Sequence, residues 1–255
     1  MILAIDAGNS RVKWGWMEID KDGGSRWSSI ATVSLIEFAA SSDHINPFSA
    51  THEDPERIII SNVAGDGARE LLINWTSIFD AAPLWLKGEA RRCGVTNRYE
   101  RPDTLGADRW AALVAARAAH TGTCLVVNAG TATTIDMLAA DGSFLGGSIL
   151  PGVELMRFVL HEHTGRLPLQ PGTVQQAPRN TLDAIETGCR NAQAGAVERL
   201  YRAFAKIAGT PPLCLIGGGA GQPLAEELDV PRRYVENLVL DGLARIAQDE
   251  KAAVR

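Results

Sequence analysis

A short pattern that occurs twice, half a chain apart, constrains the fold of this sequence more than any other feature. Residues 2–10 form an apolar run, an acid, a small residue, a glycine and two polar residues, and residues 124–133 repeat this order with an amide in place of the acid. Asp6 aligns with Asn128, so the offset is 128 − 6 = 122 residues in a chain of 255. A second apolar-rich run follows each copy and ends at an Asp-Gly turn, within residues 21–24 and at residues 141–142. The repeat predicts one strand–turn–strand unit in each half of the chain.

The two turns have the composition of a phosphate-binding site. Glycine lets the backbone approach a ligand closely, and the main-chain N–H groups of a tight turn form a concave anion site. Two such turns facing each other hold a polyphosphate from both sides. The alternative is a pair of ordinary hairpin turns, for which Asn and Gly are the usual residues. Recurrence of the pattern, each time directly after an apolar strand, favours the phosphate site.

Composition and charge exclude several classes of protein. Hydrophobic residues make up 45% and charged residues 22%, as in an ordinary core-forming protein. A net charge of −5 argues against a broad nucleic-acid or anionic-membrane surface. No apolar run is long enough to span a membrane, and Met1 leads straight into a strand, so we expect no export signal. The four cysteines are widely separated, which favours reduced thiols in a cytoplasmic protein.

Both halves are expected to have the same order of elements. The first half is expected to hold strands at 2–6, 12–18, 25–33, 58–62 and 83–87, helices at 35–40, 67–79 and 105–120, and a loop at 41–55. The second half is expected to hold strands at 124–128, 133–138, 144–150 and 213–217, with helices at 153–161, 181–208, 224–228 and 238–251. This order predicts an α/β protein of two duplicated domains, residues 1–120 and 121–255, that share a cleft.

The first candidate site follows the first strand. Asp6 ends that strand, and a carboxylate placed there can hold Mg²⁺ directly or through water. Lys13 lies where the next strand can return it towards a phosphate as a point charge. A solvated strand lysine is the equally weighted alternative.

The second candidate site opens the helix expected at 105–120. Asp108 can cap this helix, or it can orient an attacking hydroxyl. A helix N-terminus stabilises a carboxylate, so we expect Asp108 to be a weakened base. Phosphoryl transfer has a loose transition state, in which orientation matters more than basicity, so the catalytic role survives. Arg109 is a candidate partner for charge on the substrate or on Asp108.

Five motifs, in this order along the chain, resemble those of type III pantothenate kinases. They are Asp6-x-Gly8-Asn9-Ser10, Pro102-x-x-Leu105-Gly106-x-Asp108-Arg109, Gly130-Thr131-Ala132-x-Thr134-x-Asp136, Gly146-Gly147-x-Ile149-x-Pro151-Gly152 and Asn180-Thr181-x-x-Ala184-Ile185-x-x-Gly188. The resemblance covers nearly the whole chain. It implies two ribonuclease H-like domains, with mixed five-stranded sheets flanked by helices and an ATP cleft between them, as in the acetate kinase, sugar kinase, heat-shock chaperone and actin superfamily. It also implies ATP-dependent phosphorylation of pantothenate to 4′-phosphopantothenate, the first step of coenzyme A synthesis.

The resemblance also implies roles for individual residues. Those implied to contact ATP are Asp6, Ala7, Gly8, Asn9, Ser10, Arg11, Val12, Lys13 and Thr131. Those implied to contact pantothenate are Tyr99, Gly106, Ala107, Asp108, Arg109 and Thr181, with Asp108 accepting the hydroxyl proton. The family is dimeric, with the substrate pocket beside the subunit interface, so a homodimer is implied as well.

The cofactors implied are Mg²⁺, with Asp6 holding it through water or phosphate, and a monovalent cation, K⁺ or NH₄⁺. The family has a cation-binding aspartate where this chain has Asn128. An amide oxygen can still ligate K⁺ but brings no negative charge, which leaves the cation dependence open. Ser10 replaces a frequent threonine and keeps the hydroxyl.

Two other functions fit the same motifs. One is a kinase of this fold that acts on a sugar or a small carboxylate, because a fold alone does not fix a function. The other is a non-catalytic ATP-binding accessory factor for transcription, against which stands the lack of a DNA-binding module or basic stripe.

Overall fold

A computed structural model describes residues 1–20, 24–40 and 54–253 of the chain. It divides into two compact units, which we describe separately: unit 1 comprises Met1–Ala119 and Leu238–Arg255, and unit 2 comprises His120–Asn237. The break after Ala119 lies one residue from the expected boundary. The C-terminal helix differs from the expectation, because it packs with unit 1 although the sequence pattern assigned it to the second domain.

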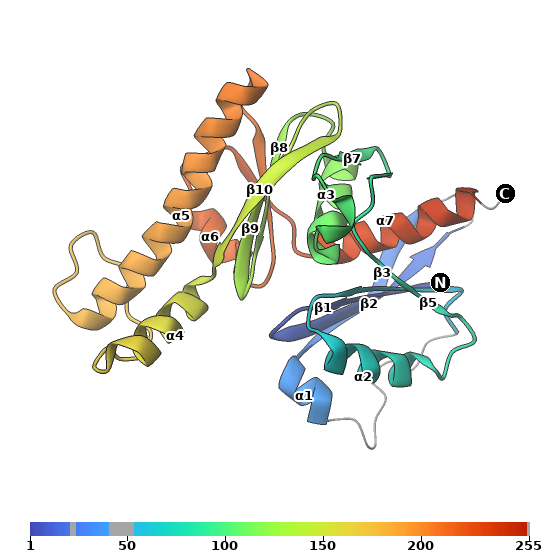
Figure 1. Cartoon of the computed structure of the whole chain (residues 1–255), viewed down its shortest axis with the longest axis horizontal. Helices are drawn as coiled ribbons and strands as arrows, with labels where there is room; N and C mark the ends of the chain where they lie inside the picture. The colour runs from blue at the N-terminus through green and yellow to red at the C-terminus, as the bar shows by residue number, and fades with distance from the viewer. Residues whose placement is uncertain (21–23, 41–53, 254–255) are drawn as a thin grey trace. The chain divides into compact units, whose positions relative to one another are not determined.

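Unit 1 is built on a five-stranded mixed sheet in the order β3-β2-β1-β4-β5 (Figure 1). The strands are β1 (Ile2–Ala7), β2 (Arg11–Ile19), β3 (Ser25–Ser34), β4 (Arg57–Asn62) and β5 (Pro83–Trp85). The first three pair antiparallel, whereas β4 pairs parallel with β1 and with β5. All five strands expected in this half are therefore present.

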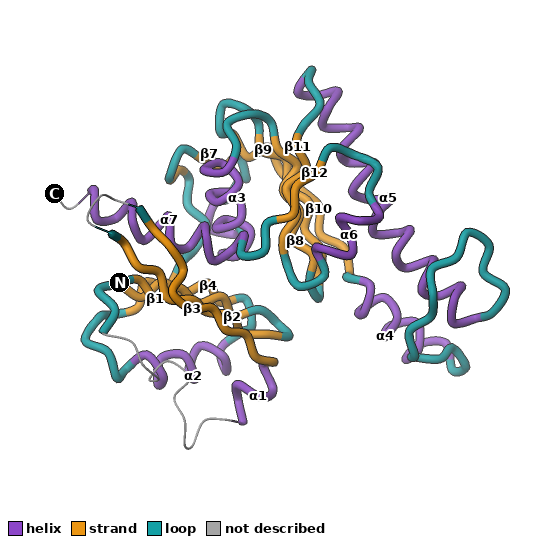
Figure 2. The backbone as a smooth tube through the Cα atoms, turned by 180° about the vertical axis from the view of Figure 1, so that it is seen from behind, coloured by secondary structure: helices purple, strands orange, loops and turns teal. Residues whose placement is uncertain are grey.

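One face of this sheet carries the core of unit 1. Helices α1 (Leu35–Ala40) and α2 (Asp66–Thr76) cover it, as Figures 1 and 2 show from opposite sides. Alternate strand residues point into this core, where they meet Phe38 of α1 and Trp75 of α2, whose ring centroids are 4.2 Å apart. The strand residues of this cluster are Leu3, Ile5, Ala7, Val12, Trp14, Trp16, Ile58 and Ile60.

The opposite face of the sheet lies under α3 (Ala107–Ala119) and α7 (Leu238–Ala253). The two helices approach closely, since a Cβ on Gly242 would come within 1.9 Å of the Ala111 carbonyl oxygen. Among the described residues, unit 1 also has a small hairpin, β6 (Arg91–Arg92) and β7 (Val95–Asn97), and a 3₁₀ turn, η2 (Pro102–Thr104).

Unit 2 repeats the plan. Its strands lie in the order β12-β11-β8-β9-β10, with β8 (Cys124–Ala129), β9 (Ala132–Leu138), β10 (Ser143–Pro151), β11 (Leu213–Gly217) and β12 (Arg232–Tyr234). The first three in the chain pair antiparallel, and β11 pairs parallel with β8. The helices are α4 (Val153–Thr164), α5 (Thr181–Ala208) and α6 (Gly221–Glu227). The expected fold class, an α/β protein with two mixed sheets flanked by helices, is confirmed; the expected five strands apply to the first sheet, whereas the second is seven-stranded.

Departures from the expected elements are local. Helix α2 ends at Thr76 and not at residue 79, and β5 ends at Trp85 and not at residue 87. The sequence pattern did not predict β6, β7, η2 or β12, because segments of two or three mostly polar residues have no readable periodicity. Residues 21–23 of the first Asp-Gly turn and residues 41–53 of the expected loop lie outside the described residues. No helix among the described residues has both the length and the apolarity to cross a membrane.

Candidate active site

The first turn, residues 8–10, joins β1 to β2 in unit 1. The Gly8 N–H donates to the Arg11 carbonyl oxygen at 2.9 Å and closes the turn. Two neighbouring segments hold its ends: the Leu35 N–H donates to the Ser10 carbonyl oxygen at 2.9 Å, and the Val63 N–H donates to the Ala7 carbonyl oxygen at 2.9 Å.

The second turn, residues 130–131, joins β8 to β9 in unit 2 and is held in the same way. The Gly130 N–H donates to the Ala132 carbonyl oxygen at 3.1 Å. The Gly152 N–H donates to the Thr131 carbonyl oxygen at 2.8 Å, and the Ala220 N–H donates to the Ala129 carbonyl oxygen at 3.0 Å. Each end of this turn is therefore tied to the segments that correspond to those around the first turn, although the turn itself is one residue shorter.

The glycines of the two turns are not required by the turns themselves. Neither Gly8 nor Gly130 has a φ in the left-handed region. A Cβ added to Gly8 would lie 3.4 Å from its nearest neighbour and one added to Gly130 would lie 3.7 Å away, which are ordinary contacts. Local geometry thus does not require glycine at either position, and the missing side chains leave room for a ligand to approach the backbone.

The Asp6 carboxyl is the most perturbed acid of unit 1. Burial and the nearby Asp108 carboxylate raise the pKa of Asp6 to about 7, while Ser61 and Lys13 act in the opposite direction. The buried Oδ1 atom of Asp6 accepts no hydrogen bond from any described residue. The fully buried Ser61 hydroxyl faces Asp6 across β1 and β4 and lies near enough to lower its pKa, but the two groups do not meet the geometry of a hydrogen bond. An unpartnered buried carboxylate oxygen is the kind of ligand that Mg²⁺ prefers, so these residues fit a divalent metal.

Lys13 lies directly opposite Asp6 in the β1–β2 register, so both side chains are on one face of the sheet. The other residues expected to contact ATP, within residues 7–12, differ in how exposed their side chains are. Asn9, Ser10 and Arg11 are exposed, whereas the side chains of Ala7 and Val12 point into the core. Any contact of Ala7 or Val12 with a nucleotide is therefore restricted to their main-chain atoms.

Asp108 lies in the first turn of α3, which begins at Ala107. Its Oδ1 accepts a hydrogen bond from the Arg109 N–H at 2.8 Å. A Cβ on Gly106 would lie 2.7 Å from this oxygen, so glycine at 106 leaves room for the carboxylate. The expectation of a weakened base is wrong in its net direction. Burial raises the pKa of Asp108, and this outweighs the lowering by the Arg109 N–H and the Arg109 charge.

Three of the residues implied to contact pantothenate are connected in unit 1. The buried Arg109 guanidinium follows Asp108 in α3 and donates to the Tyr99 hydroxyl at 2.9 Å. The Tyr99 N–H in turn donates to Asn97 Oδ1 at 3.0 Å, which fixes the backbone below the ring. Arg109 was expected to pair with charge on the substrate or on Asp108. In the structure its positive charge lowers the pKa of Asp108.

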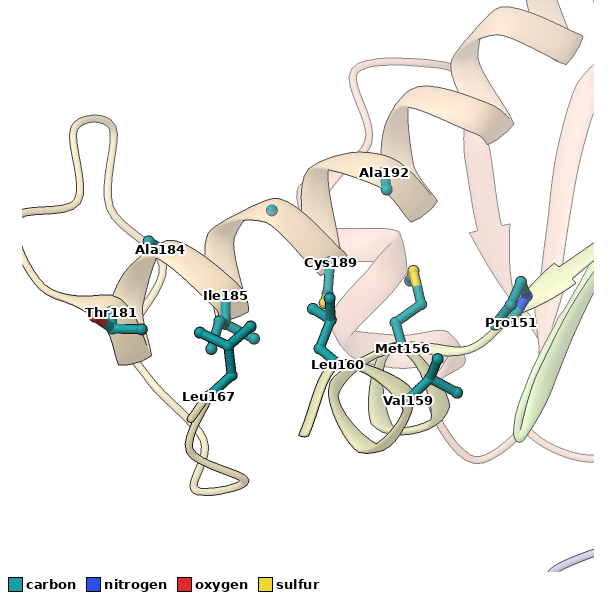
Figure 3. A pocket seen from close by; sticks show the side chains of 11 residues that line it. Pro151, Met156, Val159, Leu160, Leu167, Thr181, Ala184, Ile185, Cys189 and Ala192 are labelled. Carbon is teal, nitrogen blue, oxygen red and sulfur yellow. The ribbon is translucent and has the colours of Figure 1, made fainter. Parts of the chain in front are cut away.

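The other expected site residues lie in unit 2. Thr131 is exposed in the second turn, and Asn128 is half-buried at the end of β8. Thr181 begins α5 and lines an apolar cavity of about 610 Å³ between α4 and α5 (Figure 3). Other side chains around this cavity include Met156, Leu167, Ile185 and Cys189. Thr181 is the polar side chain at one end of it.

Sequence reasoning missed Ser61 and the cavity, and it left Gly218 unassigned, as part of either a plain strand-to-helix turn or a border of the adenosine site. Ser61 is the second-last residue of the apolar strand β4, and its pairing with Asp6 was invisible before the β1–β4 register was known. Gly218 has φ +90°, and a Cβ there would lie 2.2 Å from the Ala129 carbonyl oxygen and 2.7 Å from Asn128 Oδ1. The run of glycines at 217–219 was the available signal for this close approach.

Comparison with known proteins agrees with this geometry. A family model described as type III pantothenate kinase matches residues 2–203. The type III pantothenate kinase of Aromatoleum aromaticum is 48% identical over 253 residues, which covers 99% of this chain and 100% of that protein. The one from an Azoarcus species is 43% identical over 99% of this chain and 92% of its own length.

Solved structures support the same fold at low sequence identity. A conserved putative Baf family transcriptional activator from Campylobacter jejuni aligns with a TM-score of 0.60 at 23% identity, over 98% of this chain and 99% of its own. A putative 2-dehydro-3-deoxygalactonokinase from Sinorhizobium meliloti aligns with a TM-score of 0.59 at 18% identity, over 97% and 98% of the two chains. At this identity the likeness concerns the fold alone. The family match and the full-length relatives establish that this chain is a kinase and belongs to the type III pantothenate kinase family.

Proposed function

We propose that this chain transfers the γ-phosphoryl group of ATP to the 4′-hydroxyl of pantothenate, with Asp108 receiving the hydroxyl proton. The reaction class is that of the family, the phosphorylation of pantothenate in coenzyme A synthesis. The observation that carries the assignment of roles is the grouping of Asp6, Lys13 and Asp108 in unit 1, where the two carboxylates are close enough to raise the pKa of Asp6.

Asp108 has the environment that a general base needs. Its carboxyl is largely shielded from water, which raises its pKa and makes it a stronger proton acceptor than an exposed aspartate. One oxygen is fixed by the Arg109 N–H, so the other is oriented for a hydroxyl. Tyr99 and Arg109 support this geometry and are the proposed contacts to pantothenate.

Asp6 is the proposed holder of Mg²⁺, through water or phosphate, because its buried Oδ1 has no hydrogen-bond donor among the described residues. When bound, Mg²⁺ supplies positive charge that neutralises the triphosphate. Lys13 adds a second positive charge on the same face of the sheet. The main-chain N–H groups of the first turn, together with Thr131 of unit 2, are the proposed contacts to the phosphates.

Phosphate transfer from ATP to pantothenate, measured with and without K⁺, tests the proposed activity. Asp108→Asn tests the base: we expect kcat to fall about 10²–10⁴-fold, the usual contribution of a general base, with ATP affinity retained. Asp103→Asn is the matched control, because this exposed acid precedes the same helix and pairs with Arg101 at the surface. Near-normal turnover of Asp108→Asn would remove Asp108 from the base role.

A homodimer is the second part of the proposal. None of the α4 residues is buried within the chain, and Phe158 and Val159 of α4 are 48% and 43% exposed beside the α4–α5 cavity. An exposed apolar helix face of this kind marks an interface, and a second copy beside Thr181 would place the substrate pocket at the interface. Sedimentation of the wild type and of Phe158→Asp tests this. A dimer that the substitution dissociates supports the interface, and a monomeric wild type contradicts it.

We also propose a monovalent cation near Asn128 and a cytoplasmic location. The amide oxygen of Asn128 supports the first, and four free thiols support the second. The comparison of activity with and without K⁺ tests the cation, and cell fractionation tests the location.

A further inference from the structure

Helix α7 lies along the sheet face that carries Lys13. Lys13, Gly15 and Met17 alternate on this face of β2, opposite the core residues Trp14 and Trp16. At the far end of the helix, Gln248 Nε2 lies 3.4 Å from the Met17 sulfur as a donor.

Gly15 makes room on this face for the ring of Trp27 from the neighbouring strand β3. A Cβ at Gly15 would lie 2.8 Å from both Cε3 and Cζ3 of that indole. The indole Nε1–H of Trp27 donates a hydrogen bond to Oδ1 of Asp241, in the first turn of α7, at 2.8 Å. This hydrogen bond joins residues 214 positions apart in the chain and is partly shielded from water.

Lys13 interacts with the same carboxylate. Burial raises the pKa of Asp241, while the Trp27 hydrogen bond and the positive charge of Lys13 lower it. The spacing of the contacts agrees with this proximity. Met17 is four positions after Lys13 in the strand, a span of about 13 Å, and Gln248 is seven positions after Asp241 in the helix, a span of about 10 Å. Gln248 contacts Met17, and the Trp27 ring that covers Gly15 reaches Asp241, so Asp241 lies on the Lys13 side of this contact.

Lys13 therefore stands between two carboxylates that come from different elements. Asp6 lies opposite it on β1, and Asp241 approaches from α7. A role for Asp241 in packing alone would need only the bond to Trp27. It would not explain why a half-buried acid is kept next to a lysine of the phosphate site.

We infer that Asp241, fixed by the Trp27 indole, is a positioning residue that holds the Lys13 ammonium in place for MgATP. This inference rests on the proposed role of Lys13 in ATP binding. Without Asp241, the Lys13 ammonium would lose the carboxylate that approaches it from α7, and its charge would be drawn towards Asp6, the proposed metal ligand.

Neutralising Asp241 separates positioning from a simple charge effect, because the two predict opposite changes in the affinity for MgATP. Removal of a negative charge near a polyphosphate strengthens ATP binding if only the Coulomb term acts. Positioning predicts weaker binding, by roughly tenfold, within the range of couplings between contacting residues. Asp241→Asn is the suitable change, since its amide oxygen can still accept the Trp27 hydrogen bond.

The experiment measures the affinity for MgATP by calorimetry, without pantothenate, in the full chain. We expect Asp241→Asn to weaken binding when Lys13 is present and to have no weakening effect in the Lys13→Met background. Asp249→Asn, a neutralisation of an exposed acid on the same helix, should leave the affinity unchanged. If Asp241→Asn does not fold, Trp27→Phe takes its place, with a smaller weakening that also depends on Lys13.

Equal or tighter binding of MgATP by Asp241→Asn, with Lys13 present, would overturn the inference and leave the proposed function intact. The same holds for a weakening that persists with Lys13→Met, because it would then come from the fold and not from the lysine. A folded wild type that binds no MgATP would instead overturn both.

Discussion

The turns of the two units share one main-chain framework but differ in charge. Each is tied by equivalent hydrogen bonds, from Leu35 and Val63 in unit 1 and from Gly152 and Ala220 in unit 2. At the strand position before each turn, unit 1 has Asp6 where unit 2 has Asn128.

The residues that pair with Asp6 and with Asn128 on the neighbouring strands also differ in charge. Asp6 pairs with Lys13 on β2 and Ser61 on β4, whereas Asn128 pairs with Thr134 on β9 and Gly217 on β11. The duplication thus retained the hydrogen bonds that shape the turn, and it placed the acid and base groups in one copy only. Under the proposed function, both turns offer main-chain N–H groups to a phosphate, whereas the metal and the lysine charge depend on the side chains of unit 1.

The largest expected effect comes from making the first turn as neutral as the second. Asp6→Asn should lower kcat/KM by about 10²–10³-fold, the size of effect seen when one pre-organised electrostatic group is removed. The mutant should also lose Mg²⁺-dependent binding of ATP, as followed by calorimetry. Asp66→Asn, at an exposed acid in the first turn of α2, is the control. Activity of Asp6→Asn close to that of the wild type would show that the charge difference between the turns has no catalytic meaning.

Much of this comparison could be predicted from the sequence, because the apolar runs and the glycines that define each turn are local features. The order of elements and the equivalence of Asp6 with Asn128 needed no structure. The register was not readable, so Ser61 could not be placed beside Asp6. The sign of the pKa shift at Asp108 also required the structure, since it depends on how far burial outweighs the Arg109 N–H.

The placement of α7 shows a second limit of sequence reasoning. Its amphipathic pattern predicted a helix correctly, but chain order alone assigned it to the second domain. Its buried apolar residues, such as Leu243 and Ile246, indicate that the helix packs against a core but not which one. The specific contacts to unit 1, such as the Trp27 indole on Asp241, have no periodicity to detect.

The buried carboxylate of unit 1 should reduce the stability of the free protein. The pKa of Asp6 rises from 3.8 to about 7 on folding, so between these values the folded chain holds a proton that the unfolded chain has lost. The free energy of unfolding of the wild type should therefore decline as the pH rises from about 4 to 7, by about 1.4 kcal/mol for each step of one in pH. Asp6→Asn lacks this decline, so it should gain up to a few kcal/mol over the wild type at pH 8 and almost nothing below pH 4.

Urea unfolding of both proteins at pH 4, 6 and 8, without nucleotide or metal, measures this difference. A constant difference across the three pH values would mean that Asp6 titrates normally in the folded state. In that case the Asp6 charge would not lower the stability of the folded chain, and the two turns would not differ in this respect.

Substitution of Gly8 and Gly130 tests whether a ligand approaches the backbone of both turns. Gly8→Ala and Gly130→Ala introduce only ordinary contacts at 3.4 and 3.7 Å, so stability should change by less than about 1 kcal/mol. Binding of MgATP should nevertheless weaken by about tenfold in each, since a Cβ stands where the phosphates approach.

Gly218→Ala is the contrasting control, because its φ of +90° and the 2.2 Å approach to the Ala129 carbonyl oxygen should cost stability of about 1–3 kcal/mol. Thermal unfolding and calorimetry on the same samples separate the two classes. If Gly130→Ala binds MgATP normally while Gly8→Ala does not, the second turn is a structural copy without a ligand.

The smallest expected effect comes from returning a charge to the second turn. Asn128→Asp puts a carboxylate where the wild type has an amide oxygen, and carboxylate oxygens attract cations more strongly than neutral ones. We expect K⁺ to stimulate the wild type by no more than about twofold and the variant by about three- to fivefold, a difference of under about 1 kcal/mol. Steady-state rates in K⁺, with Na⁺ at the same ionic strength as the control, measure it. Because Asn128 lies where Asp6 lies in the other copy, a gain would mean that the second turn keeps the shape of a cation site and lacks only the charge. Equal stimulation of both proteins would place the cation away from this strand end. The turn of unit 2 would then differ from that of unit 1 both in its side chains and in binding no cation.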